Sequence, residues 1–371
     1  MKRINYVLSH PIQYQAPLIK YLAHKGIKIK TLYRSNIGTK KYFDKDFKKK
    51  IKWDIDLLHG YNYEFLNHIG PNKVSKLFPL TIEFSKVFKN TDYIWLHGVK
   101  NWYNLIIILL NFIFYKKKIL IRDEVHKFSK DRSLINILFN KLFYNLIDIF
   151  IFRYLVIGTA NKDYYLDHKI DLKKLLLIPY VVDNDFFYKK NKNKNKKYIN
   201  ILLASKFIKR KGIDIFLNSI KKCNQNIKFK KTIIITIIGD GEEKKNIKKY
   251  INLNKLDNIR LKNFKNQFSL KKEYHNSDVF ILPSRYEPWG LTINEAMAAE
   301  NLIIASKNVG ASKDLIKHNY NGFLFKNSND LSNYLLKIFK NKKRLNRFKK
   351  NSLKIIKKWN FQKCYTNLLD L

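Results

Sequence analysis

Val279 to Ala299 reads V-F-I-L-P-S-R-Y-E-P-W-G-L-T-I-N-E-A-M-A-A, and this stretch decides the fold class that we expect. A short apolar run, Val279 to Leu282, ends at Pro283 and is followed by a polar turn. From Leu291 onward the residues are good helix formers with apolar positions at helical spacing. The pattern predicts a strand, a loop and the start of a helix.

The start of this helix is expected to bind an anion. Gly290 allows close backbone approach, and the free amides of Leu291, Thr292 and Ile293 together with the helix dipole would favour a phosphate. Glu287 and Glu295 flank the site, and eight helical positions span about 12 Å or less. That length is comparable to a diphosphate with a sugar at each end. Glu287 is therefore expected to hold the sugar that is transferred, and Glu295 a ribose.

The same residues carry a resemblance to a known family. Glu287 and Glu295, with Pro283-Ser284 before them and E-A-M-A from Glu295, resemble the signature of retaining glycosyltransferases of family four. The resemblance implies an α/β fold of the GT-B type, in which two Rossmann-like, doubly wound domains face a central cleft, and a nucleotide-diphosphate sugar as donor. It covers nearly the whole chain and is strongest from Tyr198 to Leu324. Nothing in the sequence identifies the sugar.

Length and composition agree with two folded domains. The chain has 371 residues, too many for one ordinary core, and 46% of them are hydrophobic. We expect an N-terminal acceptor domain at 1–188, a Lys/Asn linker at 189–197, a nucleotide-sugar domain at 198–356, and a C-terminal helix at 357–371 that crosses back to the first domain, as the resemblance implies.

The net charge of +45 suggests a polyanionic or membrane partner. The excess is mostly Lys, is spread along the chain and accompanies abundant Ile and Asn, as in a compositionally biased genome. We therefore do not expect nucleic acid as a partner, and an anionic membrane surface fits better. Cys223 and Cys364 lack metal-ligand spacing, which indicates a reducing compartment without structural zinc. The N-terminal apolar run is too short for a signal peptide, so a cytoplasmic enzyme is expected.

Several polar residues follow predicted strands in the first half of the chain. The loop S-H-P-I-Q-Y-Q-A-P, from Ser9 to Pro17, comes after a first strand and resembles the opening of a bacterial subset of the family. Loops at the carboxyl ends of strands in open α/β sheets bind ligands. Tyr93 to Leu96 and Ile119 to Ile121 are further strands with polar residues after them. The acceptor-side candidates are His10, Gln13, Arg122, Asp123, Glu124 and His126, and His97 is placed with the catalytic residues.

In the second half, the segment from Ser205 to Gly212 resembles the family's phosphate clamp, G-R-x-x-x-x-K-G. Lys206 stands in the Arg place, which keeps a charge but loses the planar bidentate fork. Lys206 and Lys211 are expected to neutralise the leaving diphosphate. Gly239, Asp240 and Gly241 resemble the family's turn near the nucleotide base. In family enzymes the leaving phosphate is thought to take the acceptor proton on the same face of the sugar, so the resemblance implies a retaining, metal-independent hexosyltransferase without a cofactor.

Three alternatives stay open. Asp44 with Asp46, Asp54 with Asp56, and Asp183 with Asp185 each form the D-x-D pattern of metal-dependent glycosyltransferases, although three copies suggest chance. A sugar phosphorylase of similar fold would carry pyridoxal phosphate. A basic protein without enzymatic activity would bind nucleic acid or membrane with steep salt dependence.

Leu105 to Tyr115 is apolar except for Asn111 and is followed by Lys116, Lys117 and Lys118. Eleven residues are too few to span a bilayer, which needs about 20. The segment is therefore a core helix or a helix that lies against a membrane with a basic flank. The aromatic-rich region from Leu134 to Phe152 favours the membrane interpretation, which predicts a lipid-linked acceptor and a role in bacterial surface polysaccharide or lipopolysaccharide synthesis.

The chain departs from the family pattern after the decisive stretch. The family usually carries Gly where this chain has Glu300, Pro near Leu302, and Gly where it has Ala311. These departures concern the tightness of loops around the donor.

Overall fold

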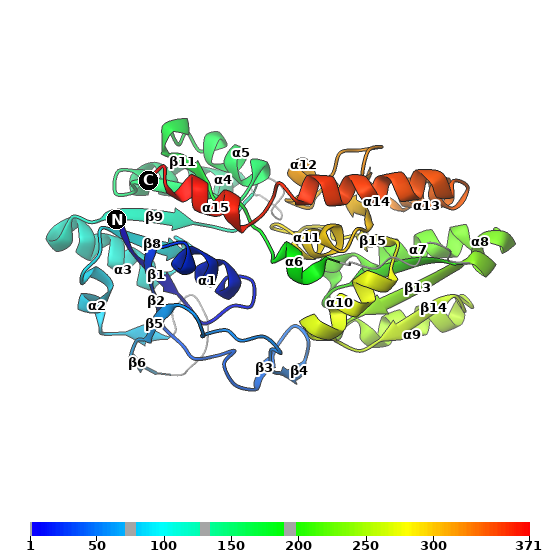
Figure 1. The fold of residues 1–371 in the computed structure, drawn as a ribbon, viewed down its shortest axis with the longest axis horizontal. Coiled ribbons are helices and arrows are strands. Elements are labelled where there is room, and N and C mark those ends of the chain that lie inside the picture. The colour runs from blue at the N-terminus through cyan, green and yellow to red at the C-terminus, as the bar shows by residue number, and fades with distance from the viewer. Residues whose placement is uncertain (1, 71–78, 127–133, 189–197) are drawn as a thin grey trace. The chain divides into compact units, whose positions relative to one another are not determined.

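A computed structural model describes residues 2–70, 79–126, 134–188 and 198–371 (Figure 1). The chain folds as two compact units. Unit 1 contains Met1–Tyr42, Ile55–Val182 and Phe361–Leu371, and unit 2 contains Phe43–Asp54 and Asp183–Asn360. The units differ from the expected domains because Phe43–Asp54 falls in unit 2 and the later boundary lies after Asn360. The expected linker 189–197 lies outside the described residues.

Unit 1 is built on a parallel sheet of seven strands in the order β11-β10-β9-β8-β1-β2-β5. The strand order reverses at β1, which lies between β2 and β8. The strands are β1 Arg3–Leu8, β2 Lys28–Tyr33, β5 Asn62–Phe65, β8 Tyr93–His97, β9 Lys118–Arg122, β10 Arg153–Val156 and β11 Leu175–Leu177, with a small antiparallel pair β6 His68–Ile69 and β7 Leu80–Thr81.

The helices of unit 1 connect these strands, as parallel pairing requires. They are α1 Ala16–His24, α2 Phe84–Phe88, α3 Trp102–Leu110, a π-helix Asn111–Tyr115, α4 Leu134–Asp148, α5 Thr159–Asp167, a 3₁₀ turn Leu172–Lys174 and α15 Phe361–Leu368. Although α15 ends the chain, it packs in unit 1: Phe361 contacts the ring of Tyr21, and the Cys364 thiol lies 3.4 Å from the Pro179 carbonyl oxygen.

Unit 2 holds a second parallel sheet, in the order β14-β13-β12-β15-β16-β17. Its strand order reverses at β12, between β13 and β15, so a ligand-binding switch point is expected at the carboxyl ends of β12 and β15. The strands are β12 Ile199–Ala204, β13 Ile233–Ile238, β14 Ile259–Lys262, β15 Val279–Leu282, β16 Leu302–Ser306 and β17 Gly322–Phe325, and the separate pair is β3 Tyr42–Asp44 with β4 Lys49–Ile51.

The helices of unit 2 follow the strands in the same way. They are α6 Asn184–Phe187, a 3₁₀ turn Lys209–Lys211, α7 Ile213–Cys223, α8 Ile227–Thr232, α9 Lys244–Leu253, α10 Gln267–Asn276, α11 Leu291–Ala298, α12 Ser312–Leu315, α13 Ser328–Phe339 and α14 Lys342–Ile356. The decisive stretch of the sequence thus forms β15, its loop and α11, as the apolar run and the helix formers predict.

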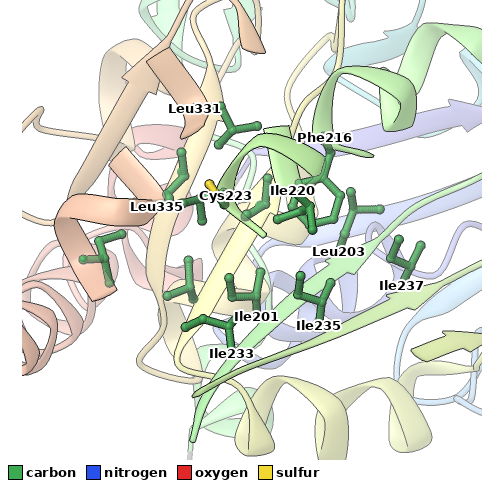
Figure 2. Close-up of a cluster of buried hydrophobic side chains, with 14 of the residues drawn as sticks. Ile201, Leu203, Phe216, Ile220, Cys223, Ile233, Ile235, Ile237, Leu331 and Leu335 are labelled. Atoms are coloured by element: carbon green, nitrogen blue, oxygen red, sulfur yellow. The ribbon is translucent and has the colours of Figure 1, made fainter. Parts of the chain in front are cut away.

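The core of unit 2 lies between its sheet and the helices α7 and α13 (Figure 2). Ile201 and Leu203 of β12 lie beside Ile235 and Ile237 of β13, and all four are buried. The helices place apolar residues at helical spacing over these strands. The contributing side chains are Phe216, Ile220 and Cys223 from α7 and Leu331 and Leu335 from α13. Strands covered on both faces read as continuous apolar runs, which is why they could be predicted.

Helix α3 is buried on one side and exposed on the other. Tyr103, Ile107 and Ile108 belong to the unit 1 core, whereas Trp102 is 61% exposed and Leu109 is 56% exposed. The apolar segment is therefore a core helix that also presents an apolar outer face. The core-helix interpretation is confirmed for the buried side, and contact of the outer face with a membrane stays a prediction.

Candidate functional site

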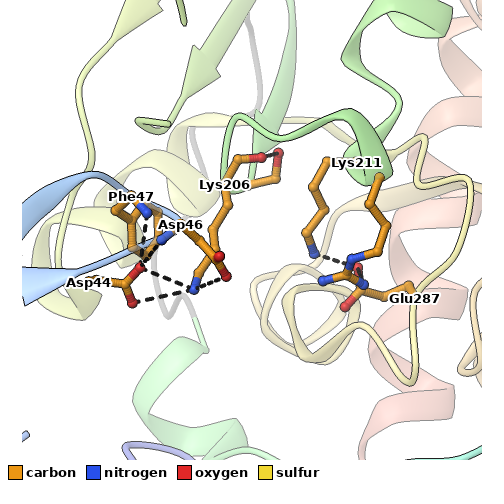
Figure 3. Close-up of polar contacts among 8 residues, drawn as sticks. Asp44, Asp46, Phe47, Lys206, Lys211 and Glu287 are labelled. Carbon is orange, nitrogen blue, oxygen red and sulfur yellow. Dashed lines mark hydrogen bonds and ion pairs between the residues drawn. The ribbon is translucent and has the colours of Figure 1, made fainter. Parts of the chain in front are cut away.

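Glu287, in the loop after β15, is held by cations from the loop after β12 (Figure 3). Its carboxylate forms an ion pair with Lys211, accepts a hydrogen bond from Ser284 Oγ at 3.3 Å, and lies 3.4 Å from an Arg210 guanidinium nitrogen. The side chains of Lys211 and Glu287 are only 13% and 12% exposed. A carboxylate and two cations therefore meet at the switch point of the second sheet.

Gly212 explains how Lys211 reaches the end of β15. Its φ is +64°, and a Cβ atom on this residue would lie 2.2 Å from the Pro283 carbonyl oxygen. The backbone amide of Arg285 also donates to the Arg210 carbonyl oxygen at 2.9 Å. The two loops thus pack backbone to backbone, which only glycine permits at this position. This contact explains why the motif has a glycine directly after Lys211.

Helix α11 begins directly after Gly290, whose φ is +96°. Leu291 and Thr292, in its first turn, are partly exposed. The preceding Trp289 is fixed because its indole N–H donates to Asn294 Oδ1 at 2.9 Å. Of the three amides expected to be free for an anion, that of Ile293 instead donates to the Gly290 carbonyl oxygen at 2.8 Å, because the first turn of the helix closes there. Binding of a donor phosphate at the helix start stays a prediction.

Glu295 lies deeper than the sequence alone suggests. It is 8% exposed, and the Tyr274 hydroxyl of α10 donates to its Oε2 at 2.7 Å. Burial raises the pKa of this carboxyl to about 7, although the Tyr274 hydrogen bond lowers it in part. Glu295 therefore joins α11 to α10, and its expected contact with a ribose stays a prediction.

Lys206 is paired with acidic residues that lie far away in the sequence. Its Nζ atom lies 3.3 Å from an Asp44 carboxylate oxygen and 2.9 Å from one of Asp46 (Figure 3). The neighbouring turn holds Gly239, Asp240 and Gly241. Burial would raise the pKa of Asp240, but its hydrogen bonds to Lys244 and to the Phe264 amide lower it overall.

The other two D-x-D motifs are used in the fold. The Asp54 carboxylate accepts from the first amides of α10, Gln267 and Phe268, at 3.1 Å each. Asp183 accepts from the Phe186 amide at 2.9 Å and caps α6. Asp56 accepts from two backbone amides of its own turn. Within the described residues, no three His, Cys, Asp or Glu side chains are grouped so that they could hold a metal ion.

Unit 1 has a polar cluster of its own at the carboxyl ends of β1, β8 and β9. Tyr14 donates to Glu124 Oε1 at 2.8 Å, Tyr180 donates to the same oxygen, and His97 Nε2 lies 3.7 Å from it. Burial would raise the pKa of Glu124, but the hydrogen bonds and charge of His97 and the two tyrosine hydroxyls bring it to about 2. Glu124 is therefore an anion at neutral pH.

His10 lies in the loop after β1 and bonds to Ser9 Oγ at 2.8 Å. Burial, with added repulsion from His97 and Arg34, lowers the pKa of His10 to about 4. The imidazole is therefore neutral at pH 7, with one ring nitrogen that can donate a hydrogen bond and one that can accept. The nearby Gln13 has a buried Oε1 atom without a hydrogen-bond partner among the described residues.

The remaining candidates on the acceptor side support the fold of unit 1. Arg122 is 1% exposed and donates to the carbonyl oxygens of Ile178 and Pro179 at 3.2 and 3.3 Å. Asp123 accepts from the Val99 amide at 2.7 Å, and burial raises the pKa of its carboxyl. His126 is fully buried. These bonds position the loop that carries Glu124.

Several site residues were not singled out from the sequence. Arg210 lies beside Glu287, and its place next to Lys211 in the K-R-K run was a usable signal. Tyr14 belongs to the S-H-P-I-Q-Y-Q-A-P loop, and only the tertiary structure shows that its hydroxyl reaches Glu124. Tyr180 and Tyr274 reach their partners through tertiary packing, for which the sequence holds no local signal.

Comparisons with known proteins agree with this description. Residues 184–355 match the family model described as "Glycosyl transferases group 1". An uncharacterized glycosyltransferase of Methanocaldococcus jannaschii is 29% identical over 165 residues, which cover 44% of each chain. The O-antigen biosynthesis glycosyltransferase WclY of Escherichia coli is 29% identical over 203 residues, which cover 51% of this chain and 54% of WclY. The chain thus spans about half the length of these curated relatives.

Solved structures share the fold along the whole chain. HepE of Anabaena in complex with UDP superposes with a TM-score of 0.74 at 15% identity, covering 100% of this chain and 99% of HepE. Sucrose-phosphate synthase of Thermosynechococcus elongatus gives a TM-score of 0.72 at 18% identity, covering 100% and 98%. The fold is of the GT-B type, with two Rossmann-like domains, and the residues that match the group 1 glycosyltransferase model, 184–355, lie in unit 2.

Proposed function

We propose that the protein is a retaining, metal-independent glycosyltransferase that moves a sugar from a nucleotide-diphosphate sugar to a lipid-linked glycan acceptor. The observation that carries the proposal is the group of Glu287, Lys211 and Arg210 beside the start of α11, within the stretch that matches the group 1 family model. HepE, a neighbour in fold, was solved with UDP and glucose, which supports this class of donor.

The proposed chemistry depends on charge. Departure of a nucleoside diphosphate places negative charge where Lys211, Arg210 and the amides of α11 supply positive charge, and such preorganised electrostatics is commonly the largest catalytic contribution. The leaving phosphate would take the proton of the acceptor hydroxyl on the same face of the sugar. Glu287 would hold hydroxyls of the transferred sugar, and its pairing with Lys211 keeps its carboxylate oriented.

A thermal-shift screen against UDP-, GDP- and ADP-sugars tests the donor class. A ligand present at 100 times its dissociation constant adds about 2.7 kcal/mol of stability, so the correct nucleotide raises the melting temperature while the free sugar does not. Turnover of the selected donor should persist in EDTA. If no nucleotide sugar stabilises the protein, the proposed function is wrong.

Two variants separate the roles of the carboxylates. Glu287→Gln should mainly lower turnover, and Glu295→Gln should mainly weaken binding of the nucleotide sugar. Wild-type kinetics in both variants would show that the site is assigned incorrectly. An absorbance band of pyridoxal phosphate would instead favour a sugar phosphorylase, and steeply salt-dependent polyanion binding without turnover would favour a basic binding protein.

The lipid-linked acceptor is supported by an apolar surface on unit 1, which we call the α3/α4 surface. Within α4, apolar side chains recur at helical spacing on the outside, and Leu138 is 66% and Leu146 is 63% exposed. Helices α3 and α4 bury their other faces in one core, and the Phe112 and Phe150 rings lie 4.9 Å apart. The α3/α4 surface consists of Trp102, Ile106, Leu109, Phe112, Ile113, Phe114, Ile135, Leu138, Phe139, Leu142, Leu146 and Ile149. Exposed apolar patches of this kind mark protein or membrane contacts.

Positive charge beside the α3/α4 surface favours an anionic membrane as its partner. Lys116, Lys117 and Lys118 follow the π-helix and, with Lys2, line a surface hollow of about 490 Å³. Each well-placed Lys near an anionic bilayer contributes about 1 kcal/mol. In the described part of the chain, no helix is both long and apolar enough to cross a membrane. Together with the similarity to WclY, the α3/α4 surface and these lysines support work at the inner face of a cytoplasmic membrane in surface polysaccharide or lipopolysaccharide synthesis.

Liposome sedimentation tests the membrane part of the proposal. The protein should bind anionic liposomes and not neutral ones, and two changes should weaken that binding: Lys116, Lys117 and Lys118 to Glu together, or Leu138→Glu with Leu142→Glu. Leu253→Glu is the matched control, because Leu253 is 72% exposed but lies in unit 2. Equal recovery in the supernatant with both liposome types at low salt would favour a soluble acceptor.

A further inference from the structure

Residues 43–54, which we call the strap, belong to unit 2 although the sequence around them belongs to unit 1. The strap contains most of the β3/β4 pair and is anchored at its far end. Asp54 caps α10, and the Lys52 carbonyl oxygen accepts from Asn266 Nδ2 at 2.7 Å. The strap is therefore fixed to the loop and helix that follow β14.

Aromatic and ionic contacts hold the middle of the strap to the same loops. The Phe47 ring lies 4.6 Å from the Phe264 ring, and the Trp53 ring lies 6.2 Å from it. Lys49 Nζ lies 3.5 Å from an Asp240 carboxylate oxygen. These partners follow β13 and β14, so the strap lies over the carboxyl edge of the second sheet, where open parallel sheets bind ligands.

The remaining contacts of the strap are with Lys206, after β12. Asp44 and Asp46 both pair with its ammonium group, which also lies 4.9 Å from the centre of the Phe47 ring. Asp44 accepts from the amides of Asp46 and Phe47 at 2.9 Å each, which fixes the turn. At Gly241 a Cβ atom would lie 2.8 Å from the Asp46 carbonyl oxygen, so the strap passes too close for a side chain.

The carboxylates of Asp44 and Asp46 are negatively charged, as a diphosphate is, and they already occupy the ammonium group of Lys206. A diphosphate could not share this ammonium group with them without repulsion between like charges. We propose that residues 43–54 form an autoinhibitory strap, in which Asp44 and Asp46 hold Lys206 and a nucleoside diphosphate gains that lysine only by displacing them. The inference rests on the proposed function, because it takes the ligand to be the nucleotide part of the donor.

Asp46 is the residue to change, because its side chain is 55% exposed. Among the described residues its carboxylate, unlike that of Asp44, accepts no hydrogen bond from within the strap. Affinity for UDP, GDP and ADP is measured by titration calorimetry at low salt. For the nucleotide that binds, Asp46→Asn should tighten binding roughly threefold, the value of one partly exposed ion pair. Asp56→Asn is the matched control, since it removes the same charge from a residue of unit 1 that accepts from the amides of its own turn, and it should leave the affinity unchanged.

The same substitution in a Lys206→Ala protein and the hydrogen exchange of the strap provide two further tests. In a Lys206→Ala protein, Asp46→Asn should no longer tighten binding, because the lysine for which the anions compete is gone. Hydrogen exchange of residues 43–54 in the wild-type protein should speed up when the bound nucleotide is added. If the nucleotide binds the wild-type protein and Asp46→Asn equally, or if it slows hydrogen exchange in the strap, the proposed autoinhibition is wrong while the proposed function stands. If no nucleotide binds either protein, both are wrong.

Discussion

Glu295 should make the stability of the protein depend on pH in a direction that is unusual for a carboxylate. The pKa of this group in the folded chain is about 7, against an ordinary value of 4.5, because it is buried beside Tyr274. Between these two values the folded chain keeps the proton and the unfolded chain releases it. Stability rises with pH only where the unfolded chain binds more protons, so here the contribution of Glu295 falls as pH rises.

The size of this effect follows from the two pKa values. The stabilisation is complete below pH 4.5 and is lost as pH rises to about 7. At about 1.4 kcal/mol for each tenfold change in proton affinity, the full loss is about 3 kcal/mol. Glu295→Gln keeps an acceptor for Tyr274 but does not titrate. The variant should therefore gain about 3 kcal/mol relative to wild type between pH 4.5 and pH 8.

Urea denaturation of both proteins across this pH range measures the difference in their free energies of unfolding. The contributions of all other titrating groups cancel because they are common to both proteins. Glu273→Gln is a control with the opposite sign. Burial would raise the pKa of Glu273, but Lys265 and Lys262 lower it overall, so its contribution is lost as pH falls. If the difference between wild type and Glu295→Gln stays constant within about 0.5 kcal/mol, Glu295 is not buried in its neutral form and the reasoning is refuted.

Other predictions concern catalysis and backbone strain. Lys211→Ala should lower turnover roughly 10²-fold or more, as for loss of one electrostatic stabiliser, and Arg210→Ala should lower it less because the closer Lys211 pair with Glu287 remains; steady-state kinetics with the selected donor decides this order. Glu300→Gly should raise the free energy of unfolding by about 1 kcal/mol, because Glu300 has a φ of +61°, which costs a residue with a side chain roughly that much. In urea denaturation, Lys249→Gly, at an exposed position inside α9, should have the opposite effect of up to about 1 kcal/mol. A loss of stability in Glu300→Gly would show that contacts of the Glu300 side chain outweigh its strain.

Much of the second sheet could be predicted because its strands are buried on both faces. The run that forms β15 contains only apolar residues, and its expected bounds, Val279 to Leu282, are those of the strand. The motif around Glu287 could be located because a strand end, a glycine and a helix start lie within a few positions of one another. Glu300 is a related case, because the family usually carries Gly at this position and the backbone of this chain is left-handed there.

The strap could not be predicted because its pairing is long-range and its partners are common. Asp44 and Lys206 are separated by 162 positions, and the chain has 74 Lys and Arg residues that a carboxylate could meet. Which side of α3 faces outward could not be predicted for a related reason. A helix that is apolar all round gives no periodic signal for which side enters the core, so only the packing of Tyr103 and Ile107 identifies the buried side.

The division of the chain has a consequence for dissection of the protein. The polypeptide changes unit after Tyr42, Asp54, Val182 and Asn360. A cut in the 189–197 segment would leave the first fragment with a hairpin whose anchoring residues are on the other piece, and without the helix that carries Cys364. Neither fragment would be a whole unit, so chimeras and truncations should follow the four crossing points, with Phe361–Leu371 kept in unit 1 and Phe43–Asp54 kept in unit 2.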